Sequence, residues 1–384
     1  MIRLAIKMLM GDRLKYLGLV AGMAFAAMMI AQQASIFSGL ASQTGTFIRE
    51  IGDVDLWVMD PQVRFSEDNL ALPETTAQRM KGIEGVDWAV PLYKGFLRCQ
   101  LADGTRTSMI VVGIDDATLF GGPTNMTAGA ITDLRRDPGI LIDERDAATK
   151  LAQKRGGDGR AMKVGDRLSI NDNDAVVIGT YKGSPSFFWD PVVYTTYSRA
   201  LRFVPKERRL MSFVLVKAKA GADLAAIKAR IEATTPYIAR TGKEFEEVTR
   251  SFILKSTGIL INFGMAIGLG FVIGLLITGQ TFFNFTLDNL RYYAALKALG
   301  TSASTLIGMV IVQVLSVTWL SFGIGIGIAA LMGIFITKTD LAFLMKWQTL
   351  AMTGGAMLIV GVLSAILSLV KVLRLEPAAV FKGA

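Results

Sequence analysis

The stretch LDNLRYYAALKALG, at positions 287–300, is a short basic segment between two long apolar ones. Helical spacing relates four of its apolar residues, Leu287, Leu290, Ala294 and Ala298. Gly300 suits the left-handed conformation that ends a helix, and Thr301 or Ser302 can cap the next one. The stretch therefore predicts a helix of about ten residues that links two membrane spans. A basic loop lying on anionic headgroups would show the same amphipathic pattern, so the pattern alone leaves both interpretations open.

Four stretches have the length and composition of membrane spans, which require about 20 mostly apolar residues. They run approximately over 17–40, 259–283, 306–336 and 350–370, and none contains Asp, Glu, Lys or Arg. The third contains Gly323, Gly325 and Gly327, which predict a tilt or a break in that helix. The first is longer than the apolar core of a signal peptide, which favours an uncleaved span.

The charge distribution predicts the orientation of these spans. The chain is 52% hydrophobic with a net charge of +9, and its mean hydropathy is +0.44. Outside residues 42–250 there are 12 Lys and Arg against 4 Asp and Glu, whereas inside that range the counts are 29 and 28. This is a topology signal and not a nucleic-acid footprint, and it predicts no nucleic-acid partner. Nine basic residues flank the spans on one side, Arg3, Lys7, Arg13, Lys15, Arg291, Lys297, Lys371, Arg374 and Lys382. The other side has only Lys338 and Lys346 in a short loop, so both termini and 287–300 are predicted to be cytoplasmic.

The predicted fold class is a polytopic α-helical membrane protein with four transmembrane helices and a large α+β extracytoplasmic domain between the first and second. The predicted segments are a cytoplasmic tail (1–16), a first span (17–41), the α+β domain with stalk helices (42–255), a second span (256–285), the linking helix (286–302), a third span (303–336), a periplasmic loop (337–347), a fourth span (348–371) and a cytoplasmic tail (372–384). The stalk segments would lie at about 34–48 and 245–256, next to the first and second spans.

Strand and helix patterns mix irregularly in the large domain, which indicates α+β and not a simple parallel crossover fold. Val54, Leu56 and Val58 alternate and predict a strand with one buried face. Two hairpins are predicted, one around Asp103-Gly104 and one with 171–174 as its turn. A further strand is predicted within 209–221, and helices within 73–85 and 222–234. The only cysteine, Cys99, alternates with leucines and is predicted to be a buried strand residue.

Few residues offer catalytic or ligand chemistry. The chain has no histidine, which removes the usual hydrolase triads and nearly all catalytic zinc sites. Acidic clusters at 115–116, 143–146 and 172–174 fall in predicted turns or helix starts, where local hydrogen bonding explains them. Gly242-Lys243 is followed by Glu244, so it is not a nucleotide-binding P-loop. We therefore expect no enzyme activity, cofactor or metal in this chain, and energy for any work must come from another protein.

Small and polar residues inside the spans predict helix packing. Gly264 with Gly268 and Gly270 with Gly274 form two close-approach steps on the second span, and Gly323 with Gly327 another on the third. Packing within the chain and packing against a second copy explain these steps equally well. Gln313 and similar polar residues at membrane depth more often join helices than bind ions.

The region LDNLRYYAALKALGTSASTLIGMVIVQ resembles the coupling-helix region of FtsX/MacB-type ABC transporter permeases, and the C-terminal LRLEPAAVFKG resembles the end of that superfamily. The layout of one span, a large domain and three spans agrees over nearly the whole chain, and ITGQTFFNFTLDNLRYYAALKALG is most similar to the DevC branch. One departure is Tyr292-Tyr293, where the family pattern has an acidic residue before Tyr.

The resemblance implies a mechanotransmission permease in the bacterial inner membrane, embedded among membrane lipids. Two copies would bind two ABC ATPase subunits, which would hold ATP and Mg, and a periplasmic adaptor and an outer-membrane channel would complete an exporter. The implied ATPase-coupling residues are Leu290, Arg291, Tyr292, Tyr293, Leu296, Lys297, Ala298, Leu299, Gly300, Glu376 and Pro377. The alternative is an FtsX-like scaffold that activates a periplasmic partner without moving cargo.

SPSFFWDP, at 184–191, is a candidate adaptor contact through Phe187, Phe188 and Trp189. Because these aromatics lead into PVVYTTY, the pattern favours a buried strand over an exposed contact.

Overall fold

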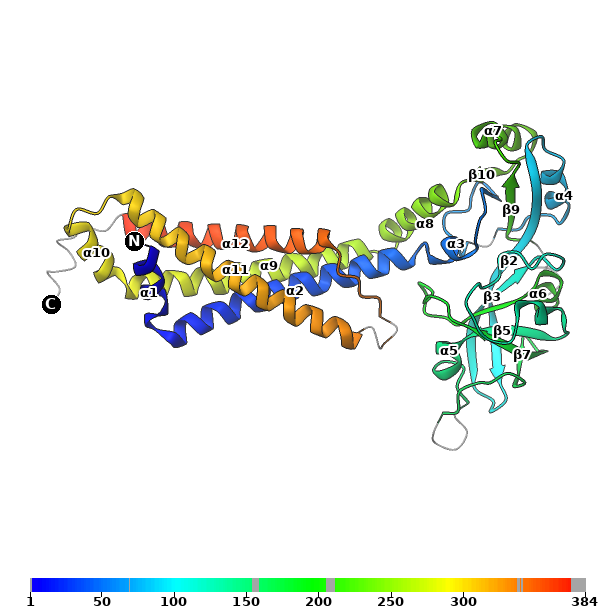
Figure 1. Ribbon diagram of the computed structural model, residues 1–384, viewed down its shortest axis with the longest axis horizontal. Coiled ribbons are helices and arrows are strands. Elements are labelled where there is room, and N and C mark those ends of the chain that lie inside the picture. Colours follow the sequence, from blue (N-terminus) through cyan, green and yellow to red (C-terminus); the bar gives the residue numbers. More distant parts are fainter. Residues whose placement is uncertain are drawn as a thin grey trace. The chain divides into compact units, whose positions relative to one another are not determined.

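The computed structural model describes residues 2–68, 70–153, 159–204, 211–336, 339 and 341–373, and it divides into two compact units. The first unit comprises 1–40 with 258–384, and the second comprises 41–257. Figure 1 shows the helices of the first unit and the strands of the second. Each unit has its own core, and they are described separately below.

Four long apolar helices make up most of the first unit, and each is long enough to cross a membrane. They are α2 (Arg13–Gln43), α9 (Ile259–Asp288), α11 (Ala303–Ile336) and α12 (Trp347–Leu373). Two short helices accompany them, α1 (Ile2–Gly11) and α10 (Leu290–Ala298). The helix α11 is continuous, so the predicted break at its glycines is wrong. A glycine removes one side chain without removing a backbone hydrogen bond, and neighbouring helices compensate for its low propensity.

Close backbone approaches hold these helices together. A Cβ atom on Gly325 of α11 would lie 2.6 Å from the Ala24 carbonyl oxygen of α2, and one on Gly361 of α12 would lie 2.7 Å from the Thr318 hydroxyl of α11. The hydroxyl of Ser321 donates a hydrogen bond to the Val20 carbonyl at 3.1 Å, which adds a polar link between α11 and α2. Small residues thus let α2, α11 and α12 approach closely, as helices in lipid require.

The second unit is built on a ten-stranded sheet whose central strand is β2 (Val86–Leu101). The N-terminal part of β2 pairs with β9 (Phe213–Ala218), which pairs in turn with β1 (Leu56–Met59) and through it β10 (Ile238–Arg240). The C-terminal part of β2 pairs with β3 (Arg106–Ile114) and with β6 (Arg167–Ile170). A single strand therefore belongs to both lobes of the sheet.

The strands of the second lobe close into a ring. From β3 the pairing continues to β8 (Val192–Thr196), β5 (Gly139–Asp143) and β7 (Asn173–Tyr181), and β7 pairs with β6, which returns to β2. The short strand β4 (Met126–Ala128) adds to the other edge of β7. Cys99 lies inside the ring with its leucine neighbours, as predicted, and its burial raises the pKa of the thiol to about 12.

Helices cover the sheet and connect it to the segments that leave the unit. They are α3 (Thr46–Glu50), α4 (Thr75–Lys81), α5 (Glu144–Ala148), α6 (Tyr197–Phe203), α7 (Leu224–Thr234) and α8 (Gly242–Ser256), with one 3-10 turn at Ile131–Arg135. The helices predicted within 73–85 and 222–234 are confirmed as α4 and α7, and the hairpin at Asp103-Gly104 is confirmed as well. The second hairpin has a tighter turn than predicted, because only Asn171 and Asp172, both with positive φ, connect its strands.

The strand β1 differs from its prediction, since all four of its residues are buried. Leu56 and Val58 face one core cluster, while Trp57 and Met59 face a second one on the other side of the sheet. The Trp57 ring lies 5.5 Å from the Phe245 ring, so the first turn of α8 covers the face of β1 that alternation predicts to be open.

The stalk helix predicted at about 245–256 is not continuous with the second span. Gly258, with a φ of +69°, separates α8 from α9.

Candidate functional site

The short helix α10 is defined by its two ends. Its first turn follows Asn289, whose carbonyl accepts from the Tyr292 amide at 3.1 Å. At its other end the Gly300 amide donates to the Lys297 carbonyl and the Thr301 amide to the Leu296 carbonyl, both at 3.1 Å. These two bonds form a Schellman motif, which requires the φ of +86° that Gly300 adopts. The predicted stop at Gly300 is therefore confirmed.

The helix α11 begins immediately after this motif. Its N-cap is Ser302, whose hydroxyl accepts from the Thr305 amide at 3.4 Å. The serine alternative of the two predicted caps is thus correct. Because capping groups end α10 and start α11 within a few residues, the connection between them is short and conformationally fixed.

The buried face of α10 differs from the predicted stripe. Leu287 belongs to α9 and is 39% exposed, and Ala298 is also exposed. The buried residues of α10 are Tyr293 and Ala294. The prediction assumed one continuous helix, but the chain turns at Asn289, so residues before and after it do not share a helical phase.

Tyr293 connects α10 to two other helices. Its hydroxyl donates a hydrogen bond to Oε1 of Gln313 on α11 at 2.9 Å, and Nε2 of Gln313 donates to the Ala5 carbonyl on α1, also at 2.9 Å. Tyr293 is fully buried, and this burial raises the pKa of its phenol to about 12. Gln313 thus joins helices, as predicted, and a displacement of α10 must move α11 and α1 or break a buried hydrogen bond.

A groove of about 550 Å³ lies between α1 and α10. Its lining is mostly apolar with a few charged side chains, namely Leu4, Lys7, Met8, Gly11, Asp12, Asp288, Asn289, Tyr292, Ala295, Leu296 and Leu299. Tyr292 is 63% exposed and Leu299 is 83% exposed, so both are free to contact a partner. The prediction of a tail at 1–16 misses α1, although Ala5 and Leu9 follow a helical period and are buried.

The remaining predicted coupling residues surround this groove or lie on the same helix. Arg291 is exposed, and Leu290 and Lys297 are half-buried. Glu376 and Pro377 lie outside the described residues. The structure therefore brings the predicted α10 residues together on one short element next to α1.

The glycine steps of α9 have two different surroundings. A Cβ on Gly274 would lie 2.6 Å from the Ala26 side chain of α2, and one on Gly270 would contact Ile30 at 3.5 Å. Gly264 and Gly268 have nothing within 4 Å of the corresponding position. The glycine step at 270–274 thus packs against α2 of the same chain, whereas the glycine step at 264–268 has no such neighbour among the described residues.

The aromatic stretch at 187–189 is a turn and not a strand, so the favoured prediction of a buried strand is wrong. Phe188 is 37% exposed, and Trp189 is 42% exposed with a φ of +58°. The strand β8 begins only at Val192, because the backbone turns after Ser186, whose carbonyl accepts from the Trp189 amide at 3.1 Å.

Two of the three acidic clusters, 115–116 and 143–146, include carboxylates that accept local hydrogen bonds. Asp115 accepts from both the amide and the hydroxyl of Thr118 at 2.8 and 2.7 Å. Asp143 caps α5 and also accepts from the Gly183 amide at 2.7 Å. The bonds from Thr118 and from the amides of α5 are those of a turn and a helix cap, whereas the bond from Gly183 joins distant parts of the chain.

Two family models match the sequence. A model described as MacB-like periplasmic core domain matches residues 16–234, which is more than half of the chain. A second, described as FtsX-like permease C-terminal, matches residues 264–377 and includes α10.

Solved structures similar to the second unit include two periplasmic or extracellular regions. The periplasmic region of MacB from Actinobacillus actinomycetemcomitans is 12% identical, with a TM-score of 0.38, and the match covers 52% of this chain and 94% of that one. The extracellular domain of the noncanonic ABC-type transporter YknZ from Gram-positive bacteria is 14% identical, with a TM-score of 0.35 and coverages of 49% and 99%. Family membership rests on the two models and not on these likenesses: the chain belongs to the FtsX/MacB-type superfamily of ABC transporter permeases, multi-pass membrane proteins that work with an ABC ATPase.

Proposed function

We propose that the chain is the membrane subunit of an ATP-driven exporter and that α10 receives the motion of the ATPase. The observation that supports this most directly is the buried link from Tyr293 through Gln313 to Ala5. A push on the exposed side of α10 is passed to α11 and α1, because the buried side cannot yield without losing hydrogen bonds. ATP and Mg bind to the partner ATPase.

The proposed orientation follows from the flanking charges, with α10 and both termini in the cytoplasm and residues 41–257 on the other side. The second unit would then pass the motion to a periplasmic adaptor and an outer-membrane channel, as in the DevC-like arrangement that the sequence resembles. Two copies would assemble, and the open step at Gly264 and Gly268 on α9 is a suitable surface for that contact.

The test is purification of the tagged chain in mild detergent, followed by mass spectrometry of the proteins that co-purify. The variant Tyr292→Glu/Leu299→Glu changes an exposed residue of α10 and the exposed residue that follows it, so it removes the contact without disturbing the core. The control is Leu341→Glu, an exposed residue in the segment between α11 and α12. We expect an ABC ATPase with the wild type and the control, and its loss from the α10 variant.

The co-purifying proteins also distinguish the two modes of action. An adaptor together with the ATPase supports export, whereas a cell-wall enzyme in place of the adaptor supports the signal-transmitting alternative. Absence of an ATPase from the wild-type sample would refute the coupling role of α10.

A further inference from the structure

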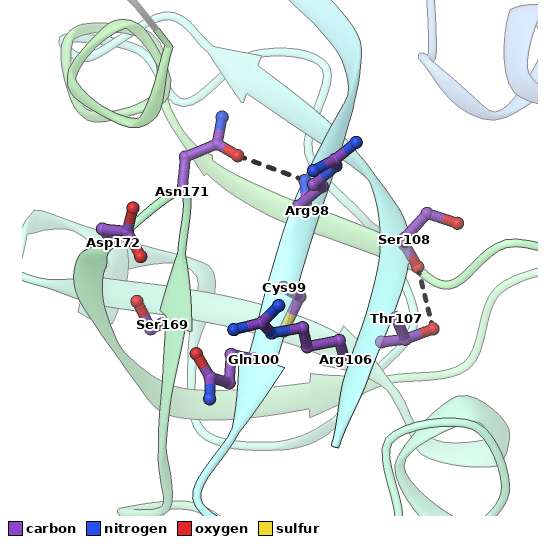
Figure 2. Close-up of a pocket in the computed structure, with 9 residues that line it drawn as sticks. All are labelled: Arg98, Cys99, Gln100, Arg106, Thr107, Ser108, Ser169, Asn171 and Asp172. Atoms are coloured by element: carbon purple, nitrogen blue, oxygen red, sulfur yellow. Dashed lines mark hydrogen bonds between the residues drawn. The ribbon is translucent and has the colours of Figure 1, made fainter. Parts of the chain in front are cut away.

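A second cleft, of about 560 Å³, lies on the outside of the strand ring, where β6, β2 and β3 meet. Figure 2 shows its polar lining, which consists of Arg98, Cys99, Gln100, Arg106, Thr107, Ser108, Ser169, Asn171 and Asp172. Cys99 forms the floor, since its side chain belongs to the core inside the ring. The side chains of Arg98, Gln100 and Arg106 are exposed on the outer surface.

The cleft carries two guanidiniums, those of Arg98 and Arg106, against one carboxylate, that of Asp172, so its lining has a net positive charge. Arg98 pairs with Ser108, and Gln100 pairs with Arg106, so the two arginines are diagonal neighbours on one face of the β2–β3 ladder. Diagonal positions are about 7–8 Å apart, so one acidic group can reach both guanidiniums. Within the part of the chain that the structure describes, no ion pair joins either guanidinium to Asp172 or to any other carboxylate.

Exposed aromatic rings continue the same surface. Phe96 precedes Arg98 on the outer side of β2 and is 45% exposed. The Phe188 ring meets it edge to face, with centroids 5.7 Å apart, and Trp189 follows. We call the surface formed by Phe96, Arg98, Arg106, Phe188 and Trp189 the arginine–aromatic face.

Hydrogen bonds hold the aromatic turn in place. The hydroxyl of Ser186 donates to the Asp190 carbonyl at 2.9 Å, the Lys150 ammonium donates to the Trp189 carbonyl, and the Ser108 hydroxyl donates to the Asp190 carboxylate. The last bond attaches the turn to β3. Trp189 keeps a positive φ that is unfavourable for a bulky residue, so the fold presents this ring to solvent at a conformational cost.

We propose that the arginine–aromatic face binds a protein partner that presents carboxylates next to an apolar side chain. Arginine and exposed aromatic rings are the residues that dominate binding energy at protein interfaces. A small anion would engage the two guanidiniums but would leave the three rings uncovered, and a lipid surface would not require the polar lining of the cleft. The inference rests on the proposed function in one respect, that this unit lies outside the cytoplasm.

The experiment is photo-crosslinking of the full-length chain in cells. The variant Phe96→p-benzoylphenylalanine places the reactive group on the face, and Ala229→p-benzoylphenylalanine, at an exposed position of α7, is the control. We expect one non-cytoplasmic protein to be captured from position 96, and the crosslinked peptide to contain Asp or Glu. Adding Arg98→Glu/Arg106→Glu should lower the yield about tenfold or more, because like charges then oppose each other. Arg98→Lys/Arg106→Lys should retain most of it.

Three results would overturn the inference: a yield from position 96 no higher than from position 229, capture of phospholipid alone, or a protein crosslink that is insensitive to the charge reversal. The thermal unfolding midpoint of each variant shows whether it is folded. Co-purification of the ATPase from the same cells separates the two hypotheses. An ATPase without the crosslink leaves the exporter function standing and refutes only this face, whereas loss of the ATPase from the wild type refutes the proposed function itself.

Discussion

Tyr292 and Tyr293 are neighbours in sequence with opposite surroundings, one largely exposed and the other fully buried. Tyr293→Phe removes the donor to Gln313 and leaves a buried amide oxygen unpaired, so we expect a loss of about 1–3 kcal/mol in the free energy of unfolding. Tyr292→Phe is the matched control and should change it by less than about 0.5 kcal/mol. Denaturant titration in detergent measures both, and equal losses in the two variants would show that the hydrogen bond contributes nothing.

Lys94 and Glu67 form a buried ion pair in the second unit, with 2.6 Å between Nζ and Oε1. Glu67→Gln leaves the Lys94 charge buried without its partner, and we expect a loss of about 3–5 kcal/mol in unfolding free energy. Glu247→Gln removes an exposed pair with Arg250 and should have little effect.

The unfolding free energy of Glu67→Gln should change with pH in a direction that the buried Lys94 determines. Burial lowers the pKa of the Lys94 ammonium in the folded chain below its ordinary value of 10.5. At a pH between the pKa values of the folded and the unfolded state, the unfolded chain therefore binds more protons than the folded one. Stability of Glu67→Gln should therefore rise as the pH increases through that window. Unfolding curves across alkaline pH test this, and a flat or falling profile would contradict it.

At the scale of elements, α11 offers a comparison within one helix. Gly325 lies against the α2 backbone, whereas Gly327 has nothing within 4 Å of its Cβ position. Gly325→Ala should destabilise the helix pair by about 1–3 kcal/mol through overpacking. Gly327→Ala should be neutral or stabilise by up to about 1 kcal/mol, since alanine favours the helix. Thermal unfolding in detergent distinguishes the two, and a larger loss for Gly327→Ala would mean that its open side is occupied.

Elements set by local chemistry were predictable, and those set by distant partners were not. Gly300 ends α10 because of its own conformational freedom, which is visible in the sequence. The bond from Tyr293 to Gln313 spans 20 residues, and the one from Gln313 to Ala5 spans 308. No local pattern carries that information. Alternation alone predicts that Trp57 faces outward, because nothing in its own strand reveals that α8 covers it.

At the scale of the whole molecule, the orientation in the membrane can be measured by labelling introduced cysteines, and Cys99 does not have to be removed first. Its thiol is buried and its raised pKa suppresses the thiolate, so it should not react with maleimide. We expect Thr105→Cys, on the exposed β2–β3 turn, to react with an impermeant maleimide in cells whose outer membrane is opened. Leu299→Cys should react only after the inner membrane is also opened, because the orientation proposed from the flanking charges has α10 in the cytoplasm. Equal labelling of both positions under either condition would contradict the orientation.

The long strand β2 has a consequence for how this unit can change in evolution. Its first half pairs with β9 and its second half with β3 and β6, so neither lobe contains a complete set of strands without it. A chimera that takes one lobe from a relative must also import half of a strand whose register the other lobe determines. We therefore expect a chimera that exchanges both lobes as one block, residues 41–257, to fold more readily than one that exchanges a single lobe.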